Sequence, residues 1–122
     1  MKRVLNVEEM TQAYERLVEN VEQFSMAPEK QIEKLRGTVA SDEIALDFGE
    51  TARVYAKKLF DNKWMSERQY SIVEEIDKKL EEMSSCKSLW NDNALLTAKE
   101  WKECGELGKK LLISLTNQGT LL

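Results

Sequence analysis

Apolar residues recur every three or four positions along most of this chain, which is the spacing of one face of an α-helix. Asn6, with Glu9 three residues later, has the pattern of a capping pair at the start of such a stripe. We therefore predict a first helix over about residues 7–24. Its buried stripe would consist of Val7, Met10, Tyr14, Leu17, Val21 and Phe24.

Two further helices are predicted before the middle of the chain. Pro28 suits the first turn of a short second helix, and Gly37 suits the turn that stops it. Ser41 is expected to cap a third helix, which would end at the sequence Asp61-Asn62-Lys63. Its buried face would carry Ile44, Phe48, Ala52, Tyr55 and Leu59.

The fourth helix is predicted to begin at Ser66, because Gln69 follows three residues later and completes a capping box. Only about five residues separate it from the third helix, so the two are expected to be antiparallel neighbours. Its apolar stripe would consist of Tyr70, Val73, Ile76, Leu80 and Met83.

The segment 88–101, SLWNDNALLTAKEW, predicts a corner before the last helix. Asn91 or Asp92 is expected to cap a short turn, and Thr97 to cap the last helix. We predict that Trp90 and Trp101 are both largely buried in the seam between helices, with their indole N–H groups bonded to loop carbonyls.

Two glycines, Gly105 and Gly108, lie three residues apart inside the predicted last helix. Glycine destabilises a helix interior because it gains no side-chain contacts and loses more conformational freedom than other residues. We therefore expect the backbone of another helix to cross closely at both positions.

Composition supports a single domain over residues 1–122 that belongs to the all-α class. One proline, five glycines, 42% apolar and 33% charged residues are typical of a compact helical chain. We expect a bundle of four to five helices, mostly antiparallel, with a short second helix. No apolar run reaches the roughly 20 residues needed to span a bilayer. In the N-terminal sequence MKRVLNVEEM, acids arrive before an apolar signal core could form, so no secretory signal is expected. A cytoplasmic protein with reduced thiols at Cys86 and Cys104 follows from this interpretation.

The sequence offers little for catalysis, and no cofactor or metal is expected. It contains no histidine to activate a nucleophile and no glycine-rich phosphate loop. One acidic pattern, Asp47-x-x-Glu50 with Glu74-x-x-Asp77, resembles the Mg²⁺-binding motifs of all-helical nucleoside triphosphate pyrophosphohydrolases. The helical periodicity directs these acids away from the apolar stripes, so this enzyme ranks third among the candidate functions.

The strongest functional signal is a run of acids on the third helix. Residues 37–52 hold four acids and no lysine or arginine, and Glu43, Asp47 and Glu50 are spaced to share one helix face. Such a face either keeps the protein soluble or steers a basic protein partner into contact. The net charge of −4 argues against binding to nucleic acid, which depends on cationic side chains. The predicted partner-binding residues are Asp42, Glu43, Asp47 and Glu50, followed by Glu74 and Asp77 on the fourth helix.

Three segments, EIALDFGETARVYAKKLF, SERQYSIVEEIDKKLEEMS and LWNDNALLTAKEWKECGELGKKLL, carry a family resemblance. Together they resemble small all-helical immunity proteins of bacterial polymorphic toxins, including those of contact-dependent growth inhibition systems. The resemblance covers about residues 41–115, and the link at residues 61–65 departs from the glycine-bearing link of the family. It implies a cytoplasmic antidote that occludes the active site of one cognate toxin domain, often a nuclease. The acidic helix face would then imitate the phosphates of the substrate.

A helical adaptor or regulatory subunit is the alternative to an immunity protein. The neighbouring genes distinguish the two. A large secreted protein with a variable C-terminal domain favours immunity, whereas a transcription or signalling operon favours an adaptor.

Overall fold

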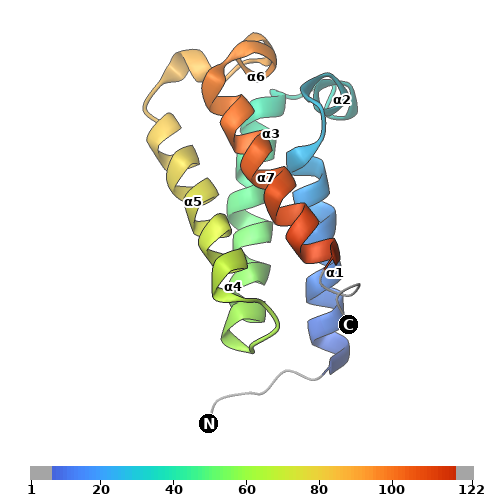
Figure 1. Cartoon of the computed structure of the whole chain (residues 1–122). Helices are drawn as coiled ribbons and strands as arrows, with labels where there is room; N and C mark the ends of the chain where they lie inside the picture. The colour runs from blue at the N-terminus through green and yellow to red at the C-terminus, as the bar shows by residue number, and fades with distance from the viewer. Residues whose placement is uncertain (1–6, 118–122) are drawn as a thin grey trace.

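The structure is a computed structural model that describes residues 7–117, all of whose regular secondary structure is helical (Figure 1). The all-α prediction is thereby confirmed. None of the helices in this range has the length and apolar character needed to cross a lipid bilayer. The elements are α1 (Val7–Ser25), α2 (Pro28–Lys34), α3 (Ala40–Asp47), the π-helical turn η1 (Phe48–Ala52), α4 (Arg53–Asp61), α5 (Glu67–Met83), the 3₁₀ turn η2 (Lys87–Leu89), α6 (Asp92–Thr97) and α7 (Lys99–Asn117).

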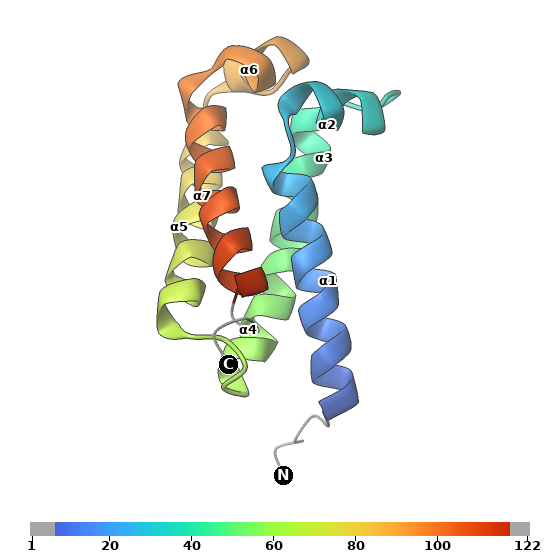
Figure 2. The same cartoon turned by 45° about the vertical axis from the view of Figure 1, so that its right-hand side comes forward.

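Four long rods form the body of the molecule: α1, the continuous rod α3–η1–α4, α5 and α7. Successive rods alternate in direction, and α2 and α6 lie over one end (Figures 1 and 2). The rod α3–η1–α4 packs between α1 and α5, and α7 closes the ring by packing against the same two helices. This is an up-down-up-down bundle with short connections, and the predicted antiparallel pair, α4 and α5, is confirmed.

The apolar stripe predicted for the first helix does face the core. Met10, Leu17, Val21 and Phe24 are buried, whereas Val7 is largely exposed. Tyr14 is half-buried, and its hydroxyl donates a hydrogen bond to the Leu115 carbonyl at 2.6 Å, which ties α1 to the end of α7. The capping role predicted for Asn6 lies outside the described residues.

The short second helix and the start of α5 follow their local sequence signals. Pro28 occupies the first turn of α2, and Gly37 has a positive φ of 95° in the turn after that helix. At α5 the capping box is complete. Ser66 Oγ accepts from the Gln69 amide at 3.1 Å, and Gln69 Oε1 accepts from the Ser66 amide at 2.9 Å.

The cap predicted at Ser41 is wrong. The helix begins one residue earlier, at Ala40, and Val39 occupies the N-cap position without a side-chain hydrogen bond. Ser41 instead turns into the protein, where its side chain is fully buried and its hydroxyl finds no hydrogen-bond partner among the described residues. Packing of the first turn of α3 therefore overrides the capping preference of serine.

The π-helical turn η1 explains how a regular four-residue repeat stays buried along a whole rod. Every fourth residue of this rod faces the core: Ala40, Ile44, Phe48, Ala52 and Ala56. In an α-helix, each four-residue step advances about 40° beyond a full turn of 3.6 residues, so the column would drift around the rod. The wider turn of η1 takes back part of that drift.

Candidate partner-binding surface

The same repeat also creates a column of side chains on the outside of the rod. Positions two residues after a buried position lie about 200° further around a helix, on its opposite side. Five exposed residues occupy these positions; the first four alternate between acidic and apolar, and the fifth is Lys58. Leu46 is 51% exposed and Val54 is 45% exposed, which is unusual for aliphatic side chains of this size. We call the first four of the five residues, Asp42, Leu46, Glu50 and Val54, the outer column.

Only two of the four acids predicted on the third helix lie in the outer column. Asp42 and Glu50 are exposed there, whereas Glu43 and Asp47 are half-buried in a neighbouring column. Asp47 turns toward α1, where the Gln23 side-chain amide donates to its carboxylate at 3.4 Å. The single stripe expected for Glu43, Asp47 and Glu50 is therefore divided, because η1 begins after Asp47 and changes the helical phase.

The two second-choice acids, Glu74 and Asp77, lie outside the outer column, on a surface that shares only Val54 with it. They line a groove between α4 and α5, where cationic side chains balance them. Arg53 Nη1 lies 3.0 Å from Asp77 Oδ2, so Asp77 already has a partner within the molecule. The other charged residues of this groove are Lys57, Lys58, Asp61, Lys78 and Glu81.

The acids of α3 and η1 lack such compensation. Within residues 7–117, neither Asp42 nor Glu50 forms an ion pair. The described residues also contain no group of three or more cysteine, aspartate or glutamate side chains placed to hold a metal ion. The outer column is thus an uncompensated acidic and apolar surface, and the acids of the pyrophosphohydrolase pattern do not converge as such a group.

The corner before α7 is built on the two tryptophans. The Trp101 indole N–H donates to the Leu89 carbonyl at 2.7 Å, and that of Trp90 donates to the Met83 carbonyl at 2.9 Å. The two rings meet edge to face, with centroids 5.3 Å apart. The predicted carbonyl partners are confirmed. Trp101 is buried as predicted, but Trp90 is only half-buried.

The local caps at this corner are partly as expected. Asn91 Oδ1 accepts from the Ala94 amide at 2.8 Å and caps α6, which confirms one of the two residues proposed for that role. The cap predicted at Thr97 is wrong, because Thr97 is the last residue of α6. Its hydroxyl donates to the Asn93 carbonyl of the preceding turn at 2.8 Å.

The two glycines of α7 have different surroundings. A Cβ atom at Gly108 would lie 2.7 Å from Ser25 Oγ and 2.9 Å from Phe24 Cδ2, so the end of α1 does approach closely there. The close neighbours are side chains, however, and not the backbone that we predicted. At Gly105 a Cβ atom would meet nothing within 4 Å, so the prediction is wrong at that position.

Neither cysteine forms a disulfide. Cys86 is exposed, whereas Cys104 is buried, with its sulfur 3.7 Å from that of Met83. Burial raises the pKa of the Cys104 thiol to about 12, and the nearby Lys79 offsets only part of this effect. The thiolate is the nucleophilic form of cysteine. Cys104 therefore remains protonated at neutral pH and acts as a core side chain.

Comparisons with protein-family models, with curated proteins and with solved structures find no match for this chain. The resemblance to immunity proteins thus remains an inference from sequence motifs.

Proposed function

We propose that this protein is a cytoplasmic immunity protein that binds a cognate bacterial toxin domain and neutralises it by occluding its active site. The observation that carries the proposal is the outer column. Its acids lack cationic partners among the described residues, and its aliphatic side chains are about half exposed. A partner surface with cationic groups around an apolar centre would pair with these acids and would shield the aliphatic side chains from water.

The two kinds of side chain contribute to binding in different ways. Asp42 and Glu50 attract a basic surface over a distance and raise the rate of encounter. Leu46 and Val54 lose contact with water in the complex, which is worth about 25 cal/mol for each Å² of apolar area buried. A nuclease is a suitable target, because it needs cationic side chains to hold the phosphates of its substrate.

The rod that carries the outer column is held on both flanks. It packs between α1 and α5, and Phe48 and Ala52 of η1 are fully buried. A surface fixed in this way loses little conformational freedom on binding, which favours affinity. Occlusion of an active site requires no chemistry from this chain, only a rigid surface of complementary shape and charge.

A growth experiment tests the proposal. The toxin domain encoded beside this gene is expressed in bacteria together with wild-type protein or with Asp42→Lys/Glu50→Lys. We expect the wild type to restore growth and the double variant to fail. The control is Glu75→Lys/Glu82→Lys, which makes the same change in charge on the groove between α5 and α7 and should restore growth.

Two results would contradict the proposal. One is equal protection by the outer-column variant and the wild type. The other is that the protein does not bind the neighbouring toxin domain and instead forms a stable complex with a transcription or signalling component. The second result would favour the helical adaptor.

A further inference from the structure

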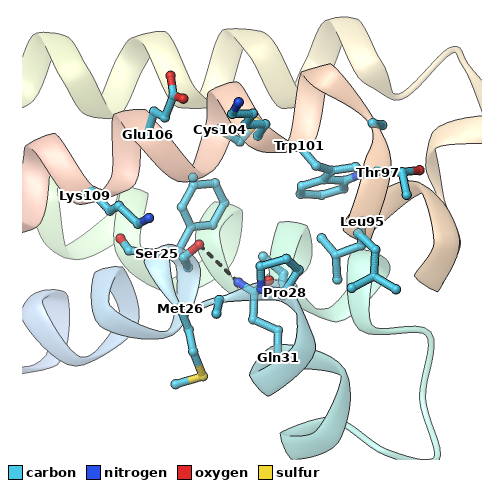
Figure 3. Close-up of a pocket in the computed structure, with 17 residues that line it drawn as sticks. Ser25, Met26, Pro28, Gln31, Leu95, Thr97, Trp101, Cys104, Glu106 and Lys109 are labelled. Atoms are coloured by element: carbon cyan, nitrogen blue, oxygen red, sulfur yellow. Dashed lines mark hydrogen bonds between the residues drawn. The ribbon is translucent and has the colours of Figure 1, made fainter.

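A pocket of about 230 Å³ opens at the end of the bundle where α1, α2, α6 and α7 meet (Figure 3). Its walls are mainly apolar and include Phe24, Ile44, Leu95 and Trp101. Of the described residues that line it, none belongs to the outer column. The pocket is therefore independent of the proposed partner-binding surface.

Gly105 gives the first indication that this space has a use. A glycine inside a helix costs about 1 kcal/mol relative to alanine. Close packing explains Gly108, but nothing lies within 4 Å of a Cβ atom at Gly105, which lines the pocket. The missing side chain keeps this wall open, as glycine does where a backbone approaches a ligand.

Gln31 gives a second, independent indication. Its side chain rises from α2 to the pocket and is only 4% exposed (Figure 3). The amide nitrogen donates to the carbonyls of Gln23 at 2.9 Å and Phe24 at 3.1 Å, which fixes the orientation of the amide. The amide oxygen, in contrast, accepts no hydrogen bond from any residue in the range 7–117. This oxygen is not among the fully buried, unpartnered atoms of the described residues, so it is open to solvent through the pocket. A ligand that displaces water from this acceptor has to bring a donor in its place to keep its affinity.

We propose that this pocket binds a small, neutral aromatic molecule that carries one N–H or O–H donor. A cavity of about 150 Å³ is large enough to hold benzene, so this pocket accommodates a ring with a few further atoms. The ring would lie against Trp101, whose own N–H is already bonded to Leu89, while the donor reaches Gln31 Oε1. The exposed rim carries Lys102, Glu106 and Lys109. Because it combines both signs of charge, the rim does not specify a charged ligand.

Titration with indole and with indene tests the proposal, because the two molecules share a shape but only indole has a donor. Binding is followed by NMR of the tryptophan indole N–H groups. We expect a saturable shift at Trp101 and none at Trp64, which lies in the link at the other end of the bundle (Figure 1). Indene should bind at least about fivefold more weakly, because it leaves the Gln31 acceptor unsatisfied.

Substitution of the open wall provides the matched test in the protein. Gly105→Leu fills the pocket and should abolish the saturable shift at Trp101. Gly105→Ala removes less space from the pocket and is compatible with a helix, so it should weaken binding without abolishing it. This variant replaces Gly105→Leu in the test if the leucine variant does not fold. Gly49→Ala is the control, because a Cβ atom there also meets nothing within 4 Å but Gly49 does not line the pocket.

Three results would overturn this inference. The first is a shift that never saturates or that is equal at Trp101 and Trp64. The second is equal affinity for indole and indene, which would remove the role of Gln31. The third is unchanged indole binding in folded Gly105→Leu or Gly105→Ala.

Discussion

The tryptophan corner and the outer column use their side chains in opposite ways. At the corner, Trp90 and Trp101 pack edge to face, and each indole N–H has a carbonyl partner within the chain. Along the outer column, exposed acids lie beside exposed aliphatic side chains and form no internal ion pairs in the described part of the chain. The most conspicuous residues of the sequence therefore serve the fold, whereas ordinary acids and aliphatics at a four-residue spacing are available to a partner.

The largest effect is expected at the corner. Trp101→Ala removes a buried ring and should lower the free energy of unfolding by about 3–5 kcal/mol. Trp90→Ala should lower the free energy of unfolding by clearly less, because Trp90 is half-buried. Urea denaturation of both variants measures the difference. Equal losses, or a loss below about 1 kcal/mol for Trp101→Ala, would show that the corner does not hold α7 as described.

Alanine substitutions at the two glycines of α7 should have opposite effects on stability. Gly108→Ala should destabilise the protein by about 1 kcal/mol, because overpacking outweighs the helix preference of alanine. The contact cannot relax freely, since Ser25 is buried and its hydroxyl donates to the Val21 carbonyl at 2.7 Å. Gly105→Ala should instead stabilise it by about 0.5–1 kcal/mol. Thermal or urea unfolding that gives both variants the same sign would contradict the difference in their surroundings.

A pair of serines tests the unpartnered hydroxyl in the first turn of α3. Ser41→Ala should raise the free energy of unfolding by about 1 kcal/mol, because it removes a buried hydroxyl without a hydrogen bond. Ser25→Ala is the control. It should lower the free energy of unfolding by about 0.5–1.5 kcal/mol, because the Ser25 hydroxyl has a hydrogen-bond partner. Loss of stability in Ser41→Ala would show that this hydroxyl is satisfied in solution.

The elements that depend on residues close together in the sequence were predicted correctly. The α1 stripe and the box formed by Ser66 and Gln69 depend on residues three or four apart, and both were predicted. Ser41 and Thr97 failed as caps because each has helix-start chemistry but lies inside an element, where packing or an internal hydrogen bond decides its role. The different surroundings of Gly105 and Gly108 depend on where α1 and α2 end in space, which no local pattern contains.

The candidate surface was predicted only in part, and η1 is the reason. Asp42 and Glu50 were predicted as contact residues, but their alignment with Leu46 and Val54 was not. A strict 3.6-residue helix places Glu50 beside Glu43 and Asp47, whereas the π-helical turn separates them. The signal was present in the sequence as five small or apolar residues at four-residue steps: Ala40, Ile44, Phe48, Ala52 and Ala56.

The most direct test of the outer column compares it with the neighbouring acids on the same rod. Asp42→Lys/Glu50→Lys and Glu43→Lys/Asp47→Lys carry the same change in charge, and the kinetics of binding to the cognate toxin domain are measured at low and high salt. We expect the first variant to associate much more slowly, most of all at low salt, with unfolding free energy within about 0.5 kcal/mol of wild type. The second variant should slow association less, because Glu43 and Asp47 lie outside the outer column and contribute only to the long-range attraction. Unchanged association of the first variant at both salt concentrations, or equal slowing of the two, would contradict the assignment of the outer column as the binding surface.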